Sequence, residues 1–281
     1  MINIRLPDSL GCTVASTGVI LSLIKSECFD EIHVFARHPE LVSHIPGIIL
    51  HDVDNHSQID LDLREYTARR PHNSKPYRAS YLHMLEMAEA SFGLTLPIII
   101  PTIHLSVADN SFAIKELSKY KKPVIWLQSK TTSRNRDWSA ENWLKLMERL
   151  SISFDFIDLS NTEFTLLQSL AITKHSFAGV CLDSFLVHGS AAVGAKNVIV
   201  LIGSSRSECM TYPGQKIIYK KSACIAQPCG MHGYYAGCKK EHEHLFSMNN
   251  CLHRNIFACM NKIEISHVEE QIQKLFATTL K

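Results

Sequence analysis

The stretch Gly179–Gly194 reads GVCLDSFLVHGSAAVG, and it is followed by the apolar run Asn197–Ile202 (NVIVLI), which ends at Gly203–Ser205. Asp183 is a residue type that commonly caps a helix. The small residues that follow predict a helix over 183–193 that packs closely on a sheet. The apolar run is typical of a buried strand. This stretch therefore predicts a helix and a strand that belong to one α/β layer.

Strands and helices alternate on both sides of this stretch. A new series of strands and helices begins after Lys121-Lys122-Pro123, and its last element is an amphipathic segment. Such alternation is typical of a parallel sheet covered by helices. The elements expected in this half are strands over 124–127 and 154–159 and helices over 140–150, 163–170 and 266–280.

The amino-terminal part repeats the same alternation in a shorter form. A polar segment over 55–75 is expected to be rich in loops. The other elements expected here are strands over 2–6, 31–36 and 47–50, a helix that ends near Lys25, and a helix over 80–90.

The fold expected is therefore α/β, with two Rossmann-like, doubly wound domains that face a cleft. A boundary between 105 and 122 gives an amino-terminal domain over 1–115 and a carboxy-terminal domain over 116–281. In such folds a ligand binds in the cleft, at the carboxyl ends of the strands.

Composition narrows the class of protein. The chain has 281 residues, of which 46% are hydrophobic, so it can build real cores. Its formal net charge of +2 gives no support to a nucleic-acid partner. The sequence contains no apolar run of transmembrane length and no hydrophobic region typical of a signal peptide. We therefore expect a cytoplasmic protein with reduced thiols.

Two segments carry residues suited to phosphate. Ser184 and His188 lie four residues apart, on one face near a helix start, where free N–H groups favour an anion. Thr132 and Arg136 follow the strand over 124–127, and a hydroxyl with a guanidinium can bind a diphosphate without a metal ion. The alternatives are a capped core helix with a satisfied histidine and a basic surface loop anchored by Trp138.

Five of the nine cysteines gather within 224–260, among several histidines. Thiolate and imidazole could hold a structural zinc or iron ion, although no Cys-x-x-Cys pair is present. Ordinary buried thiols are the alternative. The candidate metal ligands are Cys224, Cys229, Cys238, Cys251 and Cys259.

Three segments together resemble glycosyltransferase family 9, the heptosyltransferase family. The run 183–194 is similar to the family signature Asp-Ser/Thr-Gly-x-x-His followed by Ala-Ala-x-Gly. The run 128–143 is similar to its Thr/Ser, basic residue and Trp segment, and 4–13 to its first loop. The segment 224–260 resembles a Cys-rich insertion that is chiefly structural in the family.

This resemblance implies a GT-B fold and assigns roles to individual residues. Two positions depart from the family pattern. Phe185 replaces a glycine, which puts the donor sugar in question, and Cys12 replaces the aspartate proposed as general base. Asp8, in the same loop, is the alternative base, although it could equally cap a turn. The donor-binding residues implied are Thr131, Thr132, Arg136, Asp183, Ser184 and His188.

The function implied is transfer of a sugar, by default heptose from ADP-heptose, to an acceptor hydroxyl with inversion and without a catalytic cofactor. The acceptor is a lipopolysaccharide core sugar, another glycan or a protein side chain, and a peripheral position at the inner membrane is left open. One alternative is a catalytically impaired binding or scaffold protein that keeps the fold. Another is an epimerase or hydrolase of the same architecture.

Overall fold

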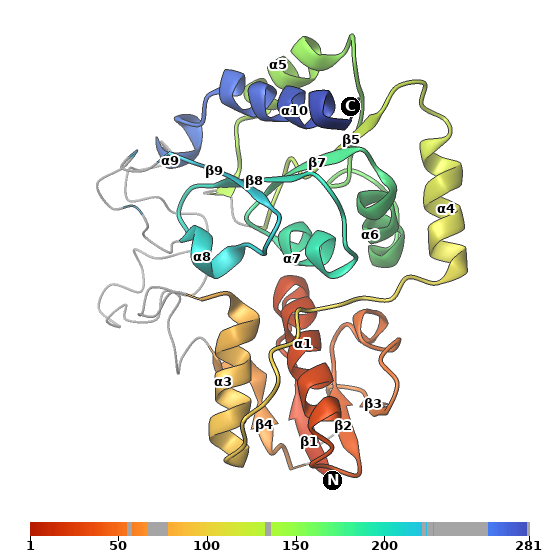
Figure 1. The fold of residues 1–281 in the computed structure, drawn as a ribbon, viewed down its shortest axis with the longest axis vertical. Coiled ribbons are helices and arrows are strands. Elements are labelled where there is room, and N and C mark those ends of the chain that lie inside the picture. Colours follow the sequence, from red (N-terminus) through yellow and green to blue (C-terminus); the bar gives the residue numbers. More distant parts are fainter. Residues whose placement is uncertain are drawn as a thin grey trace.

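The computed structural model describes residues 1–54, 58–66, 78–132, 136–220, 223, 227 and 258–279. These residues form two parallel sheets, one in each half of the chain (Figure 1). The amino-terminal sheet has the strand order β3-β2-β1-β4. Its strands are β1 (Ile2–Arg5), β2 (Ile32–Phe35), β3 (Ile48–His51) and β4 (Leu61–Asp62), and its helical elements are α1 (Leu10–Ser26), η1 (Pro39–Leu41), η2 (Leu63–Glu65) and α3 (Ser80–Phe92).

The carboxy-terminal sheet has the order β6-β5-β7-β8-β9, and all its described pairings are parallel. Its strands are β5 (Val124–Leu127), β6 (Asp155–Asp158), β7 (Ala178–Leu182), β8 (Val198–Ile202) and β9 (Lys216–Tyr219). The helices of this half are α4 (Val107–Leu117), α5 (Ala140–Leu150), α6 (Leu166–His175), α7 (Phe185–Ala192), α8 (Ser207–Met210), α9 (Ala258–Asn261) and α10 (Ile265–Thr279).

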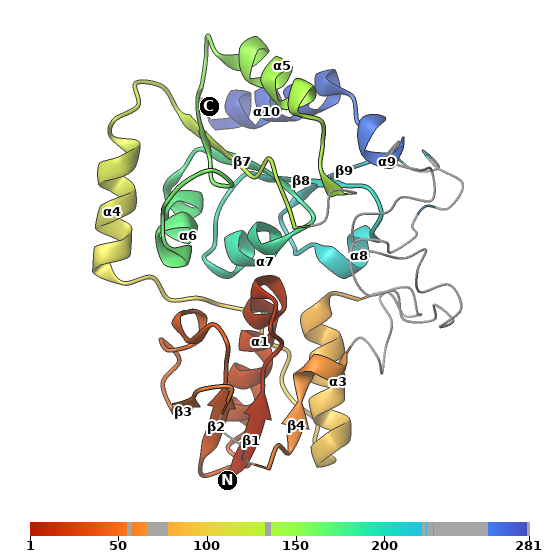
Figure 2. The same ribbon diagram turned by 180° about the vertical axis from the view of Figure 1, so that it is seen from behind.

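Helices cover both faces of the carboxy-terminal sheet (Figure 2). Side chains alternate between the faces of a strand, so Ile125 and Leu127 join a core with residues of α5 and α10. Val124 and Trp126 belong to the other core, which contains residues of α6 and α7. The expected doubly wound arrangement is therefore confirmed for this half.

Close packing between β5 and β7 depends on a glycine. A Cβ atom added at Gly179 would lie 1.9 Å from Cε2 of Trp126, whose indole is fully buried. We expect Gly179→Ala to destabilise the protein by about 1–3 kcal/mol, because the indole has no room to move in a packed core. Urea denaturation measures this change. Gly47→Ala, at a position with no atom within 4 Å, should show only the backbone cost of its φ of +84°.

The amino-terminal sheet is covered differently. Ile4 of β1 and Val34 of β2 face a core shared with α1 and α3. The opposite face carries Arg5, His33 and His51, all partly exposed. Among the described residues, helices α1 and α3 pack against each other and cover one face of this sheet.

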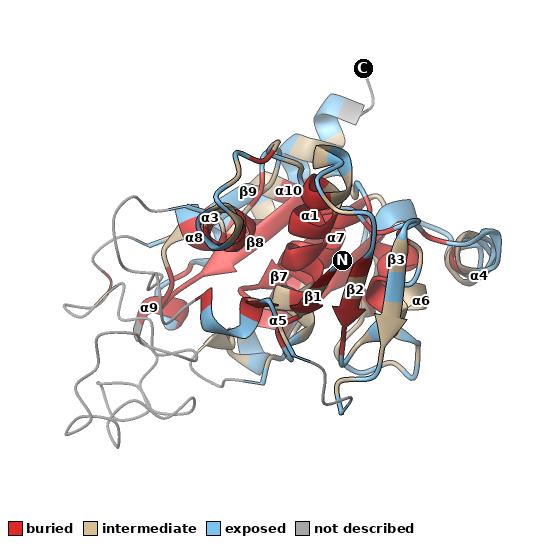
Figure 3. Cartoon of the chain, turned by 90° about the horizontal axis from the view of Figure 1, so that it is seen from below, coloured by how far each residue is buried: buried red, intermediate tan, exposed pale blue. Residues whose placement is uncertain are grey.

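The segment between α3 and α4 ties the two halves together. It passes over α1 so closely that a Cβ atom at Gly18 would lie 2.5 Å from the carbonyl oxygen of Ile99. Further along, Ile103 N–H donates to the carbonyl oxygen of Ala192 at the end of α7 (3.0 Å). Helices α1 and α7 pack on each other, and Figure 3 shows buried residues along both. The segment therefore holds the halves through α1 and α7.

Most elements expected from the sequence are confirmed, within a few residues at their ends. Helix α4, the strands β4, β7 and β9 and the short helices α8 and α9 were not expected from the sequence. Helix α4 lies inside the segment expected to hold the domain boundary and packs on α6 of the carboxy-terminal half. The boundary at 115 itself stays a prediction. In the described part of the chain, the helices fall short of the length and hydropathy needed to cross a bilayer.

Candidate functional site

Polar residues gather where three neighbouring strands of the carboxy-terminal sheet end. Gln128 follows β5 directly and Asp183 follows β7 directly, whereas Ser204 and Ser205 lie two and three residues after the end of β8. Gln128, Asp183 and both serines are buried. Arg136 reaches the same edge from the loop after β5. We call these five residues the edge cluster.

Asp183 lies at the centre of the edge cluster and is 1% exposed. Its Oδ2 accepts a hydrogen bond from the Ser205 hydroxyl. Its backbone carbonyl accepts from Nη1 of Arg136 (2.5 Å). The expectation that Asp183 caps α7 is wrong, because Ser184 is the N-cap residue and the Asp183 carboxylate turns towards β8 instead.

Arg136 and the two threonines make different contacts. Nη2 of Arg136 donates to Oγ1 of Thr132 (3.2 Å), so these two side chains meet. Thr131 is held within the loop, since its N–H and its hydroxyl both donate to Oδ1 of Asp137 (2.9 and 3.0 Å). Trp138 is buried, and its Nε1 donates to the carbonyl oxygen of Ile263 (3.2 Å). Trp138 is therefore confirmed as the buried anchor of this loop.

The amino end of α7 lies next to Asp183. Ser184 has an extended backbone and its side chain makes no capping hydrogen bond. First-turn N–H groups of a helix favour an anion. The Phe185 ring lies along the helix towards the following turn, with its Cζ 3.5 Å from where a Cβ of Gly189 would stand. Phe185 therefore replaces the glycine of the family pattern with its ring packed along α7.

His188 joins the two halves of the molecule. It is 4% exposed, and its Nδ1 lies 2.9 Å from the Tyr212 hydroxyl. Burial raises the pKa of Tyr212, so this hydroxyl stays protonated and we assign it as the donor to Nδ1. A Cβ atom at Gly11 would lie 2.8 Å from Cδ2 of His188, so the start of α1 rests on the imidazole.

Cys12 is the next residue of α1. Its Sγ lies 3.1 Å from the hydroxyl of Tyr66. Burial raises the pKa of Tyr66 well above its usual value, and the Cys12 thiol raises it further, so Tyr66 remains a hydrogen-bond donor. Cys12 thus lies one residue from the contact with His188, in the first turn of a helix, where the dipole favours negative charge.

Asp8 is held differently. Its Oδ1 accepts from Nη2 of Arg5 (3.0 Å), and its side chain is 41% exposed. Its backbone carbonyl is within hydrogen-bond distance of His38 Nε2 (3.1 Å). Asp8 is therefore paired with Arg5, and Cys12 lies nearer to α7 than Asp8 does.

Five residues of this region were not predicted as site residues, namely Tyr66, Gln128, Ser204, Ser205 and Tyr212. Gly203–Ser205 stood out only as a strand end, and a polar residue there is a signal for an edge site. Tyr66 and Tyr212 carry no local signal, because each reaches its partner through tertiary packing across more than 20 residues of sequence.

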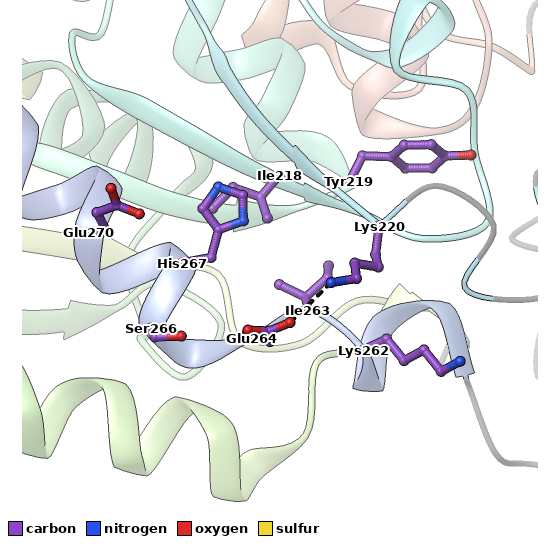
Figure 4. A pocket seen from close by; sticks show the side chains of 9 residues that line it. All are labelled: Ile218, Tyr219, Lys220, Lys262, Ile263, Glu264, Ser266, His267 and Glu270. Carbon is purple, nitrogen blue, oxygen red and sulfur yellow. Dashed lines mark hydrogen bonds and ion pairs between the residues drawn. The ribbon is translucent and has the colours of Figure 1, made fainter.

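Two cavities are lined by residues outside the edge cluster. One of about 670 Å³ lies at the carboxyl ends of β1, β2 and β3, lined by residues that include Arg5, Arg37 and His51. Another of about 300 Å³ lies between β9 and the start of α10, where Lys220 Nζ pairs with Glu264 at 3.0 Å (Figure 4). The Lys220 charge in the second cavity is thus already neutralised.

The predicted metal ligands Cys224, Cys229, Cys238 and Cys251 lie outside the described residues. Cys259 is described and buried, beside Gly203. Within the described ranges, no three His, Cys, Asp or Glu side chains come together in a way that could hold a metal ion. The metal site stays a prediction, which elemental analysis of the purified protein would test.

No model of a known protein family matches the sequence, and no curated protein sequence matches it significantly. Solved structures do match its fold. ADP-heptose lps heptosyltransferase II of E. coli has a TM-score of 0.67 at 14% identity and covers 100% of this chain and 99% of its own. A glycosyl transferase family 9 protein of Veillonella parvula has a TM-score of 0.69 at 12% identity, with coverage of 99% and 97%.

A third similar structure is TibC of enterotoxigenic E. coli, described as an iron-containing dodecameric glycosyltransferase. Its TM-score is 0.68 at 13% identity, and the match covers 100% of this chain and 80% of TibC. TibC has also been solved in complex with ADP-D-beta-D-heptose, and that structure has a TM-score of 0.67 at 12% identity, with coverage of 99% and 76%. Across nearly its whole length, this chain has the GT-B-like fold of these family 9 heptosyltransferases.

Proposed function

We propose that this protein is a family 9 glycosyltransferase that transfers a sugar, heptose by default, from ADP-heptose to an acceptor hydroxyl with inversion. The observation that carries the proposal is the meeting of Arg136, Asp183 and the amino end of α7 at one sheet edge, opposite the start of α1. The fold shared with heptosyltransferases supports the same proposal. We place the reaction in the cytoplasm.

The donor diphosphate lies between Arg136 and the first turn of α7 in this proposal. Arg136 supplies a fixed positive charge, and Ser184 adds a hydroxyl and helix N–H groups. Such donors stabilise the charge that develops on a leaving diphosphate without a metal ion. Thr132 holds the Arg136 guanidinium in place. Asp183 bonds both Ser205 and Arg136 and so fixes their positions at the sheet edge. His188 contacts the start of α1 and so bounds the site on that side.

Cys12 occupies the position from which the acceptor hydroxyl is deprotonated. It lies in the first turn of α1, and its Sγ is 3.1 Å from the Tyr66 hydroxyl. The acceptor oxygen attacks the anomeric carbon, its proton passes to the base, and the carbon–oxygen bond to the diphosphate breaks. Asp8 is the weaker candidate for this base, because Arg5 already neutralises its carboxylate.

The acceptor belongs to the amino-terminal half in this proposal. The cavity of about 670 Å³ at the carboxyl ends of β1, β2 and β3 offers room for a glycan unit. The division into an acceptor-side domain and a donor-side domain, near residue 115, is part of the same proposal.

Calorimetric titration with ADP-heptose, ADP and UDP-sugars tests the donor, and release of ADP in the presence of a heptose-deficient lipopolysaccharide core tests transfer. Selective binding of ADP-heptose followed by acceptor-dependent ADP release is the expected result. Binding without turnover would indicate a catalytically impaired binding protein instead of a transferase. Conversion of the donor without an acceptor would indicate a hydrolase or epimerase. Folded protein that binds none of these nucleotides would refute the proposal.

A further inference from the structure

Gln128 belongs to the edge cluster and begins the run 128–143, but no role has been given to its side chain. It follows β5 directly, and its backbone N–H donates to the carbonyl oxygen of Val180 in β7 (3.0 Å). Side chains alternate along a strand, so Gln128 projects to the same face as Trp126, towards α6 and α7. Asp183 follows β7 directly, as Gln128 follows β5, so both residues lie at the carboxyl ends of neighbouring strands.

The side chain of Gln128 is unusually placed for an amide. The residue is 8% exposed, and among the described residues none donates a hydrogen bond to its Oε1. A buried carbonyl oxygen without a donor lowers the stability of the folded state. An arrangement of this kind is useful where a ligand supplies the missing donor.

The strand order gives the direction in which a nucleotide sugar would lie. Tyr212 follows β8 and α8, and it contacts His188, which in turn touches Gly11 beside Cys12. The sugar to be transferred must lie near Cys12, and therefore on the β8 side of Asp183. With the diphosphate at the start of α7, the nucleoside extends to the other side, towards β5 and Gln128.

We propose that Gln128 is a donor-binding residue whose Oε1 accepts a hydrogen bond from a ribose hydroxyl of the nucleoside diphosphate. The proposal rests on the function proposed above, because it concerns the same site. It identifies the ribose as the part of the nucleotide sugar that the edge of β5 recognises, because the hydroxyls of a ribose can donate hydrogen bonds.

Calorimetry of the full chain with ADP and with 2′,3′-dideoxy-ADP tests this contact, using Gln128→Met as the variant. Methionine keeps the length of the side chain and removes the amide. We expect Gln128→Met to weaken ADP binding about tenfold and to leave dideoxy-ADP binding unchanged. The ligand-free variant should unfold at a higher temperature than the wild type, because an unsatisfied buried oxygen is gone.

The other outcomes separate this proposal from the proposed function. Equal ADP binding by wild type and Gln128→Met would overturn the contact and leave the transferase proposal standing. An equal loss for both nucleotides, or a lower unfolding temperature, would show a structural role for Gln128 and also overturn it. A wild type that binds neither nucleotide would refute both proposals together.

Discussion

Replacing Arg136 by alanine is expected to weaken ADP-heptose binding about 100-fold. In the structure, the Arg136 guanidinium bonds the Asp183 carbonyl and the Thr132 hydroxyl, which fixes it at the edge where the diphosphate is proposed to lie. A hydrogen bond to a charged group contributes about 1.5–3 kcal/mol, and the variant also loses the anchor on Asp183. Isothermal titration calorimetry with ADP-heptose measures the effect.

The matched control for Arg136→Ala is Lys145→Ala. Lys145 is an exposed cation on α5 that pairs with Glu141 at 2.5 Å, so its removal changes net charge by the same amount outside the edge cluster. ADP-heptose affinity should stay within about twofold in this variant, since an exposed i, i+4 pair contributes only about 0.3–0.5 kcal/mol. Equal ADP-heptose affinity in both variants and in the wild type would show that Arg136 does not bind the donor.

Replacing Cys12 by aspartate is expected to raise the transfer rate about 100-fold. A carboxylate is ordinarily ionised at neutral pH, and the Tyr66 hydroxyl, which lies 3.1 Å from the thiol, is placed to donate to it. General base catalysis by a positioned side chain contributes about 10²–10⁴-fold. The rate of ADP release from ADP-heptose, with a heptose-deficient lipopolysaccharide core as acceptor, measures the gain.

Asp8→Asn and Cys12→Ala decide between the two candidate bases. We expect Cys12→Ala to lower the rate and Asp8→Asn to change it little, because the Asp8 carboxylate is committed to Arg5. Thermal unfolding of both variants checks that each is folded. A large loss in Asp8→Asn, with Cys12→Asp no faster than the wild type, would assign the base to Asp8.

Local sequence patterns predicted much of the carboxy-terminal half. The helix over 140–150 and the strand over 124–127 are found with the expected bounds, because apolar spacing and a serine N-cap act within a few residues. Strand β7 was missed, since its sequence AGVCL merges into the helix signature that follows it. Helix α4 was missed for a related reason. Ala113 is its one buried residue, so its sequence shows little periodicity of apolar residues.

The sequence by itself determined the α/β class, the parallel order of elements and the segments that carry Arg136, Ser184 and His188. The class and the order follow from hydrophobic spacing, which is a local property of the chain, whereas the segments stand out through their resemblance to family 9 motifs. Only the tertiary structure decided that Asp183 bonds Ser205, that Cys12 meets Tyr66, and that His188 rests against Gly11. Each of these contacts joins elements distant in sequence, and their geometry depends on how two sheets and their helices pack.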